Sequence, residues 1–384
     1  MISFTFDFYE KVIWVATIIF CLIAKLCYNA PLRKRGGLGQ PLPNPVAVIL
    51  PILFFTAFAA LRKEIGDTFY YAHSFELFGD VKAPVTAKLF FTSMFSFFQN
   101  TIHNLTDEPQ WLIAFSAIFA LPVPVFILYK YSYPFDLSIY MFVTYGYLGG
   151  LVNGMRQYMA AAIVLCGTRY LFSLKRGAFI KYAVIIMLAW SMHNSALIMI
   201  PFFIVARRKA WQLSSYVILL GSLMATVAFD ALLPSFLGAV ENTSYKDYSY
   251  NGWFTNGVEG GSNIGRVIIA AYPIIISFLY RERLKPLGHI GDVLINLGLL
   301  NVAINIIATY NWIFARLAIY LMIYYIILTV WVVTCAVPPK EKQVYYYATI
   351  LAFFLYSRFL NYQIAGYASD YFFPGRKLFR SKTL

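Results

Sequence analysis

The chain is built from long apolar segments separated by shorter polar connections, and each apolar segment holds few charged residues. A helix needs roughly 20 apolar residues to cross the hydrocarbon core of a bilayer. Within lipid, such a helix satisfies its own backbone hydrogen bonds. The segments occupy residues 12–28, 46–61, 111–130, 135–152, 155–173, 212–232, 265–280, 290–309, 313–336 and 344–362. This pattern predicts an all-α, polytopic integral membrane protein with about ten transmembrane helices.

One further apolar stretch, residues 178–206, does not fit a simple crossing. Basic residues stand at both of its ends, Arg176 before it and Arg207–Lys209 after it. The positive-inside rule assigns both ends to the cytoplasm. A polar pentapeptide at 191–195 divides the stretch into halves that are each too short to cross alone. We therefore expect a re-entrant hairpin whose apex is packed in protein or lines a wet cavity. The alternative is one ordinary helix of about 25 residues that violates the charge rule.

Basic residues gather in several connections, and the positive-inside rule places such loops in the cytoplasm. The clusters are Arg33–Arg35, Lys175–Arg176, Arg207–Lys209, Arg281–Lys285, and Lys340 with Lys342. Alternation of the spans then puts the N-terminus outside. A basic cluster rather than a small-residue cleavage site follows the first span, so we expect a retained anchor and not a signal peptide. The basic tail, residues 376–382, would also lie outside, against the rule.

Two longer polar connections, residues 62–110 and 233–264, are expected on the outer side. The first contains an amphipathic stretch, residues 86–103, suited to lying flat in the membrane interface. The second is rich in Tyr, Asn and Gly, and we expect an ordered loop able to touch a sugar or a lipid headgroup. No stretch resembles a separate soluble domain. Residues 1–384 are therefore predicted to form a single membrane domain.

The amino-acid composition limits the kinds of chemistry that the chain can perform. Hydrophobic residues make up 60% of the chain and charged residues 12%, whereas soluble domains carry about 25% charged residues. Basic cytoplasmic loops account for the net charge of +14, although that charge would also suit an anionic partner. All four cysteines lie in or beside apolar segments, so we expect no disulfide, no zinc and no cofactor. No nucleotide-binding or hydrolase motif appears, which argues against nucleotide-driven chemistry. We expect no nucleic-acid partner.

Four arginines fall near the outer ends of the predicted helices, where the positive-inside rule gives no reason for them. They are Arg62, Arg156, Arg266 and Arg316. Any one of them could be a side chain that snorkels to a headgroup. Together they favour an outward-facing anion site, because the planar guanidinium pairs with phosphate oxygens in two places at once. A pyrophosphate at the outer leaflet would suit them.

Three other polar residues are candidates for chemistry. Asp67 follows Arg62 by five residues and either forms a surface salt bridge or orients cations and accepts a proton; Gly66 before it allows a tight turn. His193 lies in the polar pentapeptide, where it is either a hydrogen-bonded core residue or a functional group. Gln157 can exchange hydrogen bonds with sugar hydroxyls.

Five segments resemble, in order and spacing, those of the EpsG family of exopolysaccharide polymerases, a Wzy-like group. They are LRKEIGDTFYY at 61–71, GMRQYMAAAIVL at 154–165, LAWSMHNSALIMIP at 188–201, NIGRVI at 263–268 and ARLAIYL at 315–321. The resemblance extends from about residue 10 to 335. The chain departs from the family where its Gly-Thr-Asp becomes Gly66-Asp67-Thr68.

The resemblance implies a GT-C-like membrane glycosyltransferase without a metal. Such proteins join undecaprenyl-pyrophosphate-linked oligosaccharide repeat units at the outer face of the bacterial cytoplasmic membrane, in a pathway with a flippase and a chain-length regulator. An acceptor hydroxyl attacks the anomeric carbon, and undecaprenyl pyrophosphate leaves. For this reaction we expect the substrate to be bound by Arg62, Arg156, Gln157, Arg266, Arg316 and Tyr320, because fixed cations stabilise a leaving group that gains negative charge. We expect His193 or Asp67 to be the base or orienting group, and the sequence does not decide between them.

Three alternatives remain at this level. A flippase or transporter of the same lipid-linked sugar would also hold cations in a membrane cavity, but it should show two related halves, and no internal repeat is found. An O-antigen-type ligase would share the arginines and differ only in its acceptor. An acyltransferase should place a catalytic histidine near a cytoplasmic donor.

Overall fold

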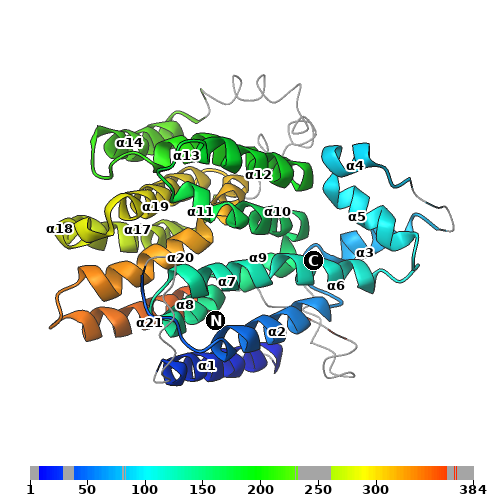
Figure 1. Cartoon of the computed structure of the whole chain (residues 1–384), viewed down its shortest axis with the longest axis horizontal. Helices are drawn as coiled ribbons and strands as arrows, with labels where there is room; N and C mark the ends of the chain where they lie inside the picture. Colours follow the sequence, from blue (N-terminus) through cyan, green and yellow to red (C-terminus); the bar gives the residue numbers. More distant parts are fainter. Residues whose placement is uncertain are drawn as a thin grey trace. The chain divides into compact units, whose positions relative to one another are not determined.

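The computed structural model describes residues 8–28, 39–79, 82, 84–229, 231, 261–360, 367 and 369. Of these residues 79% are helical, and no β-strand occurs among them (Figure 1). Long apolar side chains remain exposed on many helices, as they do on a protein whose solvent is lipid. The predicted all-α, polytopic membrane fold is confirmed. The basic cluster Arg33–Arg35 and the tail from residue 376 lie outside the described residues.

Three helical stretches in the described ranges are long and apolar enough to cross a membrane, and a bent pair adds a fourth. The three are Gln110–Tyr131, Arg281–Ala308 and Trp312–Ala336; the pair is Phe135–Thr144 with Tyr147–Asn153, bent by 44°. Six further apolar helices have only 10 to 17 residues. Local breaks shorten them, since the chain leaves the helical path at positions such as Gly154 and Gly167. The count of about ten spans therefore stays a prediction.

The described chain groups into two compact units. The first holds residues 1–167, 184–196 and 361–384, and the second holds residues 168–183 and 197–360. The chain passes between the units four times, twice within a helix, in α12 (Ala178–Met192) and in the 3-10 helix η1 (Asn194–Ile198). This interleaved connection is not that of two domains joined by a linker. The prediction of a single membrane domain is not tested by the grouping.

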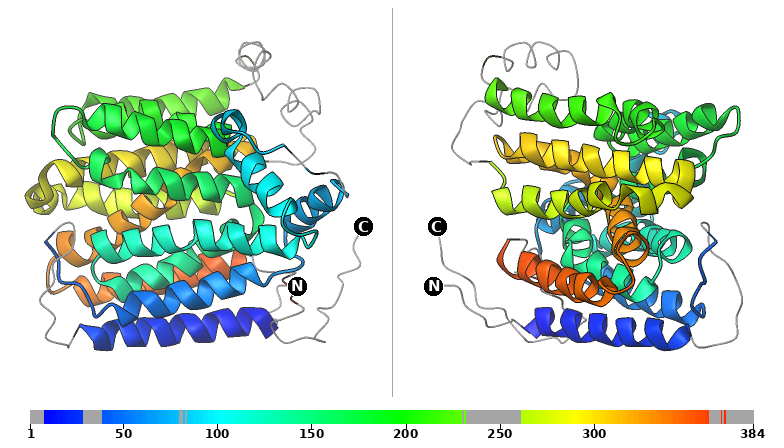
Figure 2. Two further views of the ribbon diagram at one scale, coloured as in Figure 1. Left: turned by 45° about the vertical axis from the view of Figure 1, so that its right-hand side comes forward. Right: turned by 90° about the vertical axis from the view of Figure 1, so that its left-hand side faces the viewer.

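Ten helices make up most of the first unit. They are α1 (Phe8–Cys27), α2 (Val46–Ala60), α3 (Thr68–Glu76), α4 (Ala87–Thr92), α5 (Met94–His103), α6 (Gln110–Ala120), α7 (Pro122–Tyr131), α8 (Phe135–Thr144), α9 (Tyr147–Asn153) and α10 (Met155–Cys166). Helix α1 packs on α2 and α8, and α2 packs on α6 and α7. Figures 1 and 2 show α1, α2, α6, α7 and α8 side by side with similar axis directions.

Side-chain contacts define two ends of the first unit. At one end, the backbone N–H of Phe135 donates to the hydroxyl of Tyr28 at 2.8 Å, which joins the end of α1 to the start of α8. At the other end, the side-chain amide of Gln110 donates to the carbonyl of Ala60 at 2.6 Å, which joins the start of α6 to the end of α2. The second end carries the candidate site.

The polar connection 62–110 is helical over much of its length. Its amphipathic part forms α4 and α5, which are broken at Ser93. The hydroxyl of Thr86 accepts from the backbone N–H of Leu89 at 3.1 Å and caps α4. Helices α3 and α5 both pack against α6, and Figure 1 shows α3, α4 and α5 grouped beside it. The other predicted loop, 233–264, lies mostly outside the described residues.

Helix α19 (Gly288–Ala308) is central to the second unit, and most of its residues are buried. It packs against α13, α14, α17, η4 and α20. The remaining helices are α11 (Thr168–Leu171), α13 (Met199–Ala206), α14 (Leu213–Val227), α17 (Ile264–Leu279), α18 (Arg281–Leu284), η3 (Lys285–Leu287), the 3-10 helix η4 (Trp312–Leu321), α20 (Met322–Trp331), the π-helix η5 (Val332–Ala336) and α21 (Lys342–Phe359).

The stretch 178–206 is a helical hairpin. Helix α12 ends at Met192, and a 3-10 helix, η1 (Asn194–Ile198), leads into α13. The ring of Phe203 lies 4.9 Å from that of Tyr182 and 5.4 Å from that of Phe179. In one continuous helix, residues 182 and 203 would be about 32 Å apart. The stretch therefore folds back as predicted, and the single ordinary helix is excluded; that both of its ends lie in the cytoplasm stays a prediction.

Candidate functional site

The end of α2 shows how the first unit builds a polar corner. A helix leaves its last carbonyls without intrahelical partners, and here side chains supply the missing donors. The donors are the hydroxyl of Tyr367 to Phe58 at 2.7 Å, the guanidinium of Arg62 to Ala59, the amide of Gln110 to Ala60, and the hydroxyl of Ser369 to Leu61. Three separate parts of the chain therefore fix the position at which residue 62 leaves the helix.

Arg62 is enclosed in this corner, with only 1% of its surface exposed. Besides the Ala59 carbonyl, its Nε donates to the hydroxyl of Thr68 at 3.1 Å. Burial lowers the pKa of Arg62 to about 10, so the side chain remains cationic at neutral pH. Its described contacts tie the loop 62–67 to the end of α2. The predicted role in substrate binding is not tested by this arrangement.

The turn before α3 is held against the end of α9. The backbone N–H of Asp67 donates to Oδ1 of Asn153 at 3.1 Å. Gly66 has a φ of +49°, and a Cβ at this position would lie 2.0 Å from Oδ1 of Asn153. Both the backbone conformation and the close approach therefore require glycine. Asp67 is half-buried at the N-terminus of α3, and its carboxylate does not cap that helix.

Arg156 is the accessible cation of the first unit's site. It lies in the first turn of α10 and is exposed. Its guanidinium lies 5.2 Å from the ring centroid of Phe95 on α5. The Phe95 ring in turn contacts that of Tyr71 on α3 at 5.3 Å. No carboxylate in the described part of the chain forms an ion pair with Arg156. An aromatic face positions the cation without neutralising it.

Gln157, Ser195 and His193 form a chain of hydrogen bonds. The backbone N–H of Ser195 donates to Nδ1 of His193 at 3.3 Å, so Nδ1 carries the lone pair. The Ser195 hydroxyl, 2.7 Å from the same nitrogen, then donates to it and accepts from Nε2 of Gln157 at 3.2 Å. In the neutral ring the proton is consequently on Nε2. His193 presents an N–H donor there rather than a lone pair.

Glycine shapes the approach to Arg156 and Gln157. Gly146 adopts a φ of +91° and produces the bend between α8 and α9. A Cβ at Gly150 would lie 1.9 Å from the hydroxyl of Tyr158. Only glycine lets the Tyr158 ring lie across the end of α9, where it also packs edge-on to Tyr147 at 5.0 Å. Because the chain bends at Gly146 and leaves the helical path at Gly154, Arg156 and Gln157 lie in the first turn of a new helix, α10.

The other three candidates belong to the second unit. Arg266 lies in the first turn of α17 and donates from Nε to the hydroxyl of Tyr356 at 3.5 Å. Arg316 is exposed on η4, with its guanidinium 5.2 Å from the Trp312 ring. Tyr320 is fully buried four residues later.

Arg266 and Arg316 lie on helices that begin at the same end of the second unit. The backbone N–H of Ser262 donates to the carbonyl of Ala308 at 2.7 Å, which places the start of α17 at the end of α19. A Cβ at Gly261 would lie 1.4 Å from the Thr309 carbonyl oxygen, so glycine permits this approach. The helix η4 begins three residues after Thr309.

A family model covers most of the chain. The model of the EpsG family matches residues 46–374. The chain belongs to the EpsG family. EpsG proteins resemble exopolysaccharide and O-antigen polymerases and reside in membranes. No curated protein and no solved structure matches the chain.

Within this EpsG protein, the structure brings together Arg62, Asp67, Arg156, Gln157 and His193 in one unit. Sequence reasoning assigned Ser195 no role beyond its place in the polar pentapeptide and assigned Asn153 none, although Asn153 accepts from the Asp67 N–H and Ser195 from Gln157. Gln110, Tyr367 and Ser369 carried no sequence signal at all, since they act from distant segments. No group of three His, Cys, Asp or Glu side chains suited to a metal ion occurs among the residues that the EpsG structure describes.

Proposed function

We propose that this EpsG protein polymerises oligosaccharide repeat units carried on undecaprenyl pyrophosphate, at the outer face of the bacterial cytoplasmic membrane. It is a GT-C-like, Wzy-type glycosyltransferase. The observation that carries the proposal is the grouping of an accessible arginine, Arg156, with the hydrogen-bonded chain Gln157–Ser195–His193. A polyanionic leaving group and a sugar hydroxyl need these two kinds of partner side by side.

The reaction forms one bond and breaks one. The acceptor hydroxyl attacks the anomeric carbon of the growing chain, the bond from that carbon to the pyrophosphate oxygen breaks, and its electron pair leaves with the pyrophosphate. The hydroxyl proton passes to a base. Asp67 is the base in this proposal, because a carboxylate accepts a proton. His193 fits the other role, since its Nε2–H can donate to a phosphate oxygen.

The arginines stabilise the leaving group. Negative charge grows on the pyrophosphate as the bond breaks, so cations fixed in advance bind the transition state more tightly than the ground state. Arg156 fills this role in the first unit, and Arg266 and Arg316 are assigned the same role on charge and position. Arg62 acts differently, by holding the 62–67 loop and thus Asp67. Gln157 contacts sugar hydroxyls, and Tyr320 is assigned to the same substrate.

The test is glycan length in cells whose own polymerase gene is deleted and replaced by a variant. Arg156→Lys and Arg316→Lys keep the charge and lose the planar fork. We expect single lipid-linked repeats to accumulate and polymer to disappear, with the protein inserted at normal levels. Arg281→Lys is the matched control, because Arg281 also lies over an aromatic ring, that of Phe278 at 4.9 Å, far from the site in sequence. Normal polymer from both test variants would overturn the pyrophosphate role.

The same assay separates a polymerase from its alternatives. A ligase variant would leave polymer length normal and block its transfer to a final acceptor. A flippase variant would trap lipid-linked repeats on the cytoplasmic side, where an external glycosidase cannot reach them. Accumulation of single repeats at the outer face supports a polymerase.

A further inference from the structure

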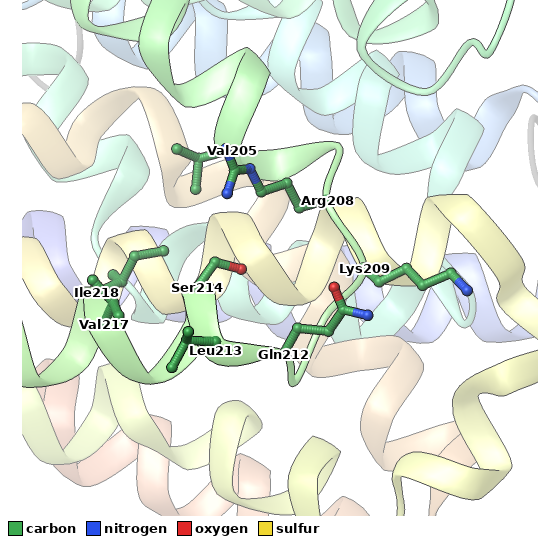
Figure 3. A pocket seen from close by; sticks show the side chains of 8 residues that line it. All are labelled: Val205, Arg208, Lys209, Gln212, Leu213, Ser214, Val217 and Ile218. Carbon is green, nitrogen blue, oxygen red and sulfur yellow. The ribbon is translucent and has the colours of Figure 1, made fainter.

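A pocket of about 590 Å³ opens between the end of α13 and the start of α14 in the second unit. One part of its lining is apolar and the other is basic or polar. Its residues are Val205, Arg208, Lys209, Gln212, Leu213, Ser214, Val217 and Ile218 (Figure 3). The volume falls in the range of small-molecule sites. None of these residues belongs to the candidate catalytic site.

The pocket lies at the end of the second unit opposite Arg266 and Arg316. The backbone N–H of Ala210 donates to Oδ1 of Asp292 at 3.0 Å, in the first turns of α19. Arg266 and Arg316, in contrast, start near the last turn of α19. The charge rule assigns the 207–209 cluster to the cytoplasm, so the pocket faces the inner leaflet in that scheme.

The three consecutive basic residues have different roles. Arg207 donates to the carbonyls of Tyr170 and Ser173 and lies 4.8 Å from the ring centroid of Phe203, so it fastens the hairpin. Arg208 and Lys209 are exposed. In the described ranges, no carboxylate forms an ion pair with either of them. Their charges are thus available to an anion.

Hydrogen bonds from α19 fix the backbone that carries Arg208 and Lys209. The side-chain amide of Asn296 donates to the carbonyl of Arg208 at 2.7 Å and to that of Ala206 at 3.1 Å. The Asp292 bond to Ala210 holds the next residue. Asp292 is not part of the pocket lining. A basic pair on a fixed turn loses little conformational freedom when it binds, which favours a specific ligand.

The neighbouring surface identifies the kind of ligand. Helix α14 continues from the pocket with an unpartnered apolar face, on which Leu213, Val217, Leu220 and Met224 are 78%, 58%, 60% and 71% exposed. Such a face belongs in hydrocarbon. The pocket therefore has cations at one side and a lipid-facing helix at the other, which matches the polarity of a phospholipid and not that of a soluble acidic peptide. Basic pockets between membrane helices on the cytoplasmic side are suited to anionic headgroups.

We propose that this pocket binds one anionic phospholipid of the inner leaflet. Arg208 and Lys209 hold the headgroup phosphate, Gln212 and Ser214 donate to its polar groups, and the acyl chains run along Leu213 and Val217. The bound lipid braces the turn 207–212, which follows the hairpin, against α14. The site is distinct from the polymerase site proposed above, and it depends on neither the sugar substrate nor the reaction.

The test measures lipid retained by the purified full-length protein in native mass spectrometry, with phosphatidylglycerol and phosphatidylcholine offered in equal amounts. We expect the wild-type protein to retain phosphatidylglycerol in preference. In Arg208→Gln/Lys209→Gln the preference should fall roughly 30-fold, as expected for the loss of two cations at an anionic headgroup. Val217→Trp fills the pocket and keeps both charges, and it should lower the retention of phosphatidylglycerol to a similar extent.

A matched control removes the same charge elsewhere. Arg283→Gln/Lys285→Gln changes two exposed basic residues of a connection outside the pocket and should retain phosphatidylglycerol as the wild type does. An equal loss in this control would assign the preference to net charge and overturn the proposal, as would wild-type retention in Arg208→Gln/Lys209→Gln. Displacement of phosphatidylglycerol by millimolar inorganic phosphate would mean an ion site without a lipid requirement, and would also overturn it. Because the Gln substitutions are on exposed side chains, they decide the question even if Val217→Trp fails to fold.

Discussion

Gln157 donates from Nε2 to the hydroxyl of Ser195 at 3.2 Å, which links the start of α10 to the apex of the hairpin. The backbone N–H of Ser195 donates to Nδ1 of His193 at 3.3 Å, so the Ser195 hydroxyl, 2.7 Å from the same nitrogen, donates to it as well. Ser195 therefore sets the tautomer of His193, and Gln157 holds the Ser195 hydroxyl in place. The consequence is that His193 offers a donor at Nε2, and this assignment can be tested.

Ser195→Ala should lower the rate of polymerisation roughly 100-fold, since a misplacement of about 1 Å in a catalytic group can cost that much. The ring of His193 loses the hydroxyl that orients it but keeps its charge and size. Ser195→Thr keeps the hydroxyl and should restore most of the activity. The measurement is kcat and KM with a lipid-linked repeat in detergent, and the loss should fall on kcat.

Ser191→Ala is the control for this position. Its hydroxyl donates to the Leu188 carbonyl at 2.8 Å in the same apex. This variant should retain near-normal kcat. Equal losses in Ser191→Ala and Ser195→Ala would reduce Ser195 to a structural part of the hairpin.

Gly66→Ala should disrupt the turn that carries Asp67. The substitution places a Cβ at a φ of +49° and 2.0 Å from Oδ1 of Asn153. The left-handed backbone alone costs about 1–2 kcal/mol, and the clash with Asn153 adds to it. We expect lost polymerisation and a lower melting temperature of the purified protein.

Gly79→Ala separates the two effects. Gly79 has a φ of +54°, and a Cβ there meets nothing within 4 Å. It should show the backbone cost alone and retain activity. Asn153→Ala relieves the clash but also removes the acceptor of the Asp67 N–H, so the double variant is compared with Asn153→Ala alone. If Gly66→Ala costs as much stability in the Asn153→Ala background as in the wild type, the steric argument is refuted.

Tyr367→Phe should destabilise the first unit without changing its packing. The ring stacks on Phe58 at a centroid distance of 4.0 Å and stays in place, whereas the hydroxyl that donates to the Phe58 carbonyl is lost. A buried carbonyl left without its donor costs about 1–3 kcal/mol. Chemical or thermal unfolding of the purified protein measures the change.

Tyr70→Phe serves as the comparison, because Tyr70 is 71% exposed and should change stability by less than about 0.5 kcal/mol. Tyr367→Phe with wild-type stability would contradict the capping role of the C-terminal segment. Ser369→Ala, which removes the donor to Leu61, should add to the loss.

The hairpin predicts a cross-link between its arms. In a background with Cys21, Cys27, Cys166 and Cys335 replaced by Ser, the pair Phe179→Cys/Phe203→Cys should react with a short bismaleimide inside one chain, since the two rings are 5.4 Å apart. The readout is the mass of a tryptic peptide pair.

Phe179→Cys/Met192→Cys is the negative control, because the two positions are about 20 Å apart along α12. If the first pair fails to react under conditions in which each single cysteine is labelled, the hairpin is contradicted. Reaction of the first pair alone supports the hairpin.

Particular residues show how far the sequence leads. Hydropathy located the helices that begin at Gln110, Gly288 and Trp312 to within a few residues, because burial in lipid acts on composition segment by segment. The basic residues at Arg176 and Arg207 predicted the hairpin, because the positive-inside rule places both clusters on the cytoplasmic side of the membrane. The resemblance in five segments led to the family that the comparison then showed.

The candidate site was found only in part. Arg156 and His193 were selected because a cation and a histidine are costly inside lipid. The burial of Arg62, by contrast, depends on donors that reach it from elsewhere, and no local pattern contains that information. The shortness of the apolar helices was missed for a similar reason: glycines such as Gly146 read as apolar but permit the breaks.

The sequence by itself determined that the chain is a helical membrane protein of the EpsG type, with four arginines near the ends of its apolar segments. Only the tertiary structure decided what each polar group does. The bonds Gln157–Ser195, Asp67–Asn153 and Ser369–Leu61 join residues 38, 86 and 308 positions apart. Hydropathy and charge act along the chain and can be read from it, whereas a hydrogen bond requires two groups about 3 Å apart in space, and packing alone creates that proximity.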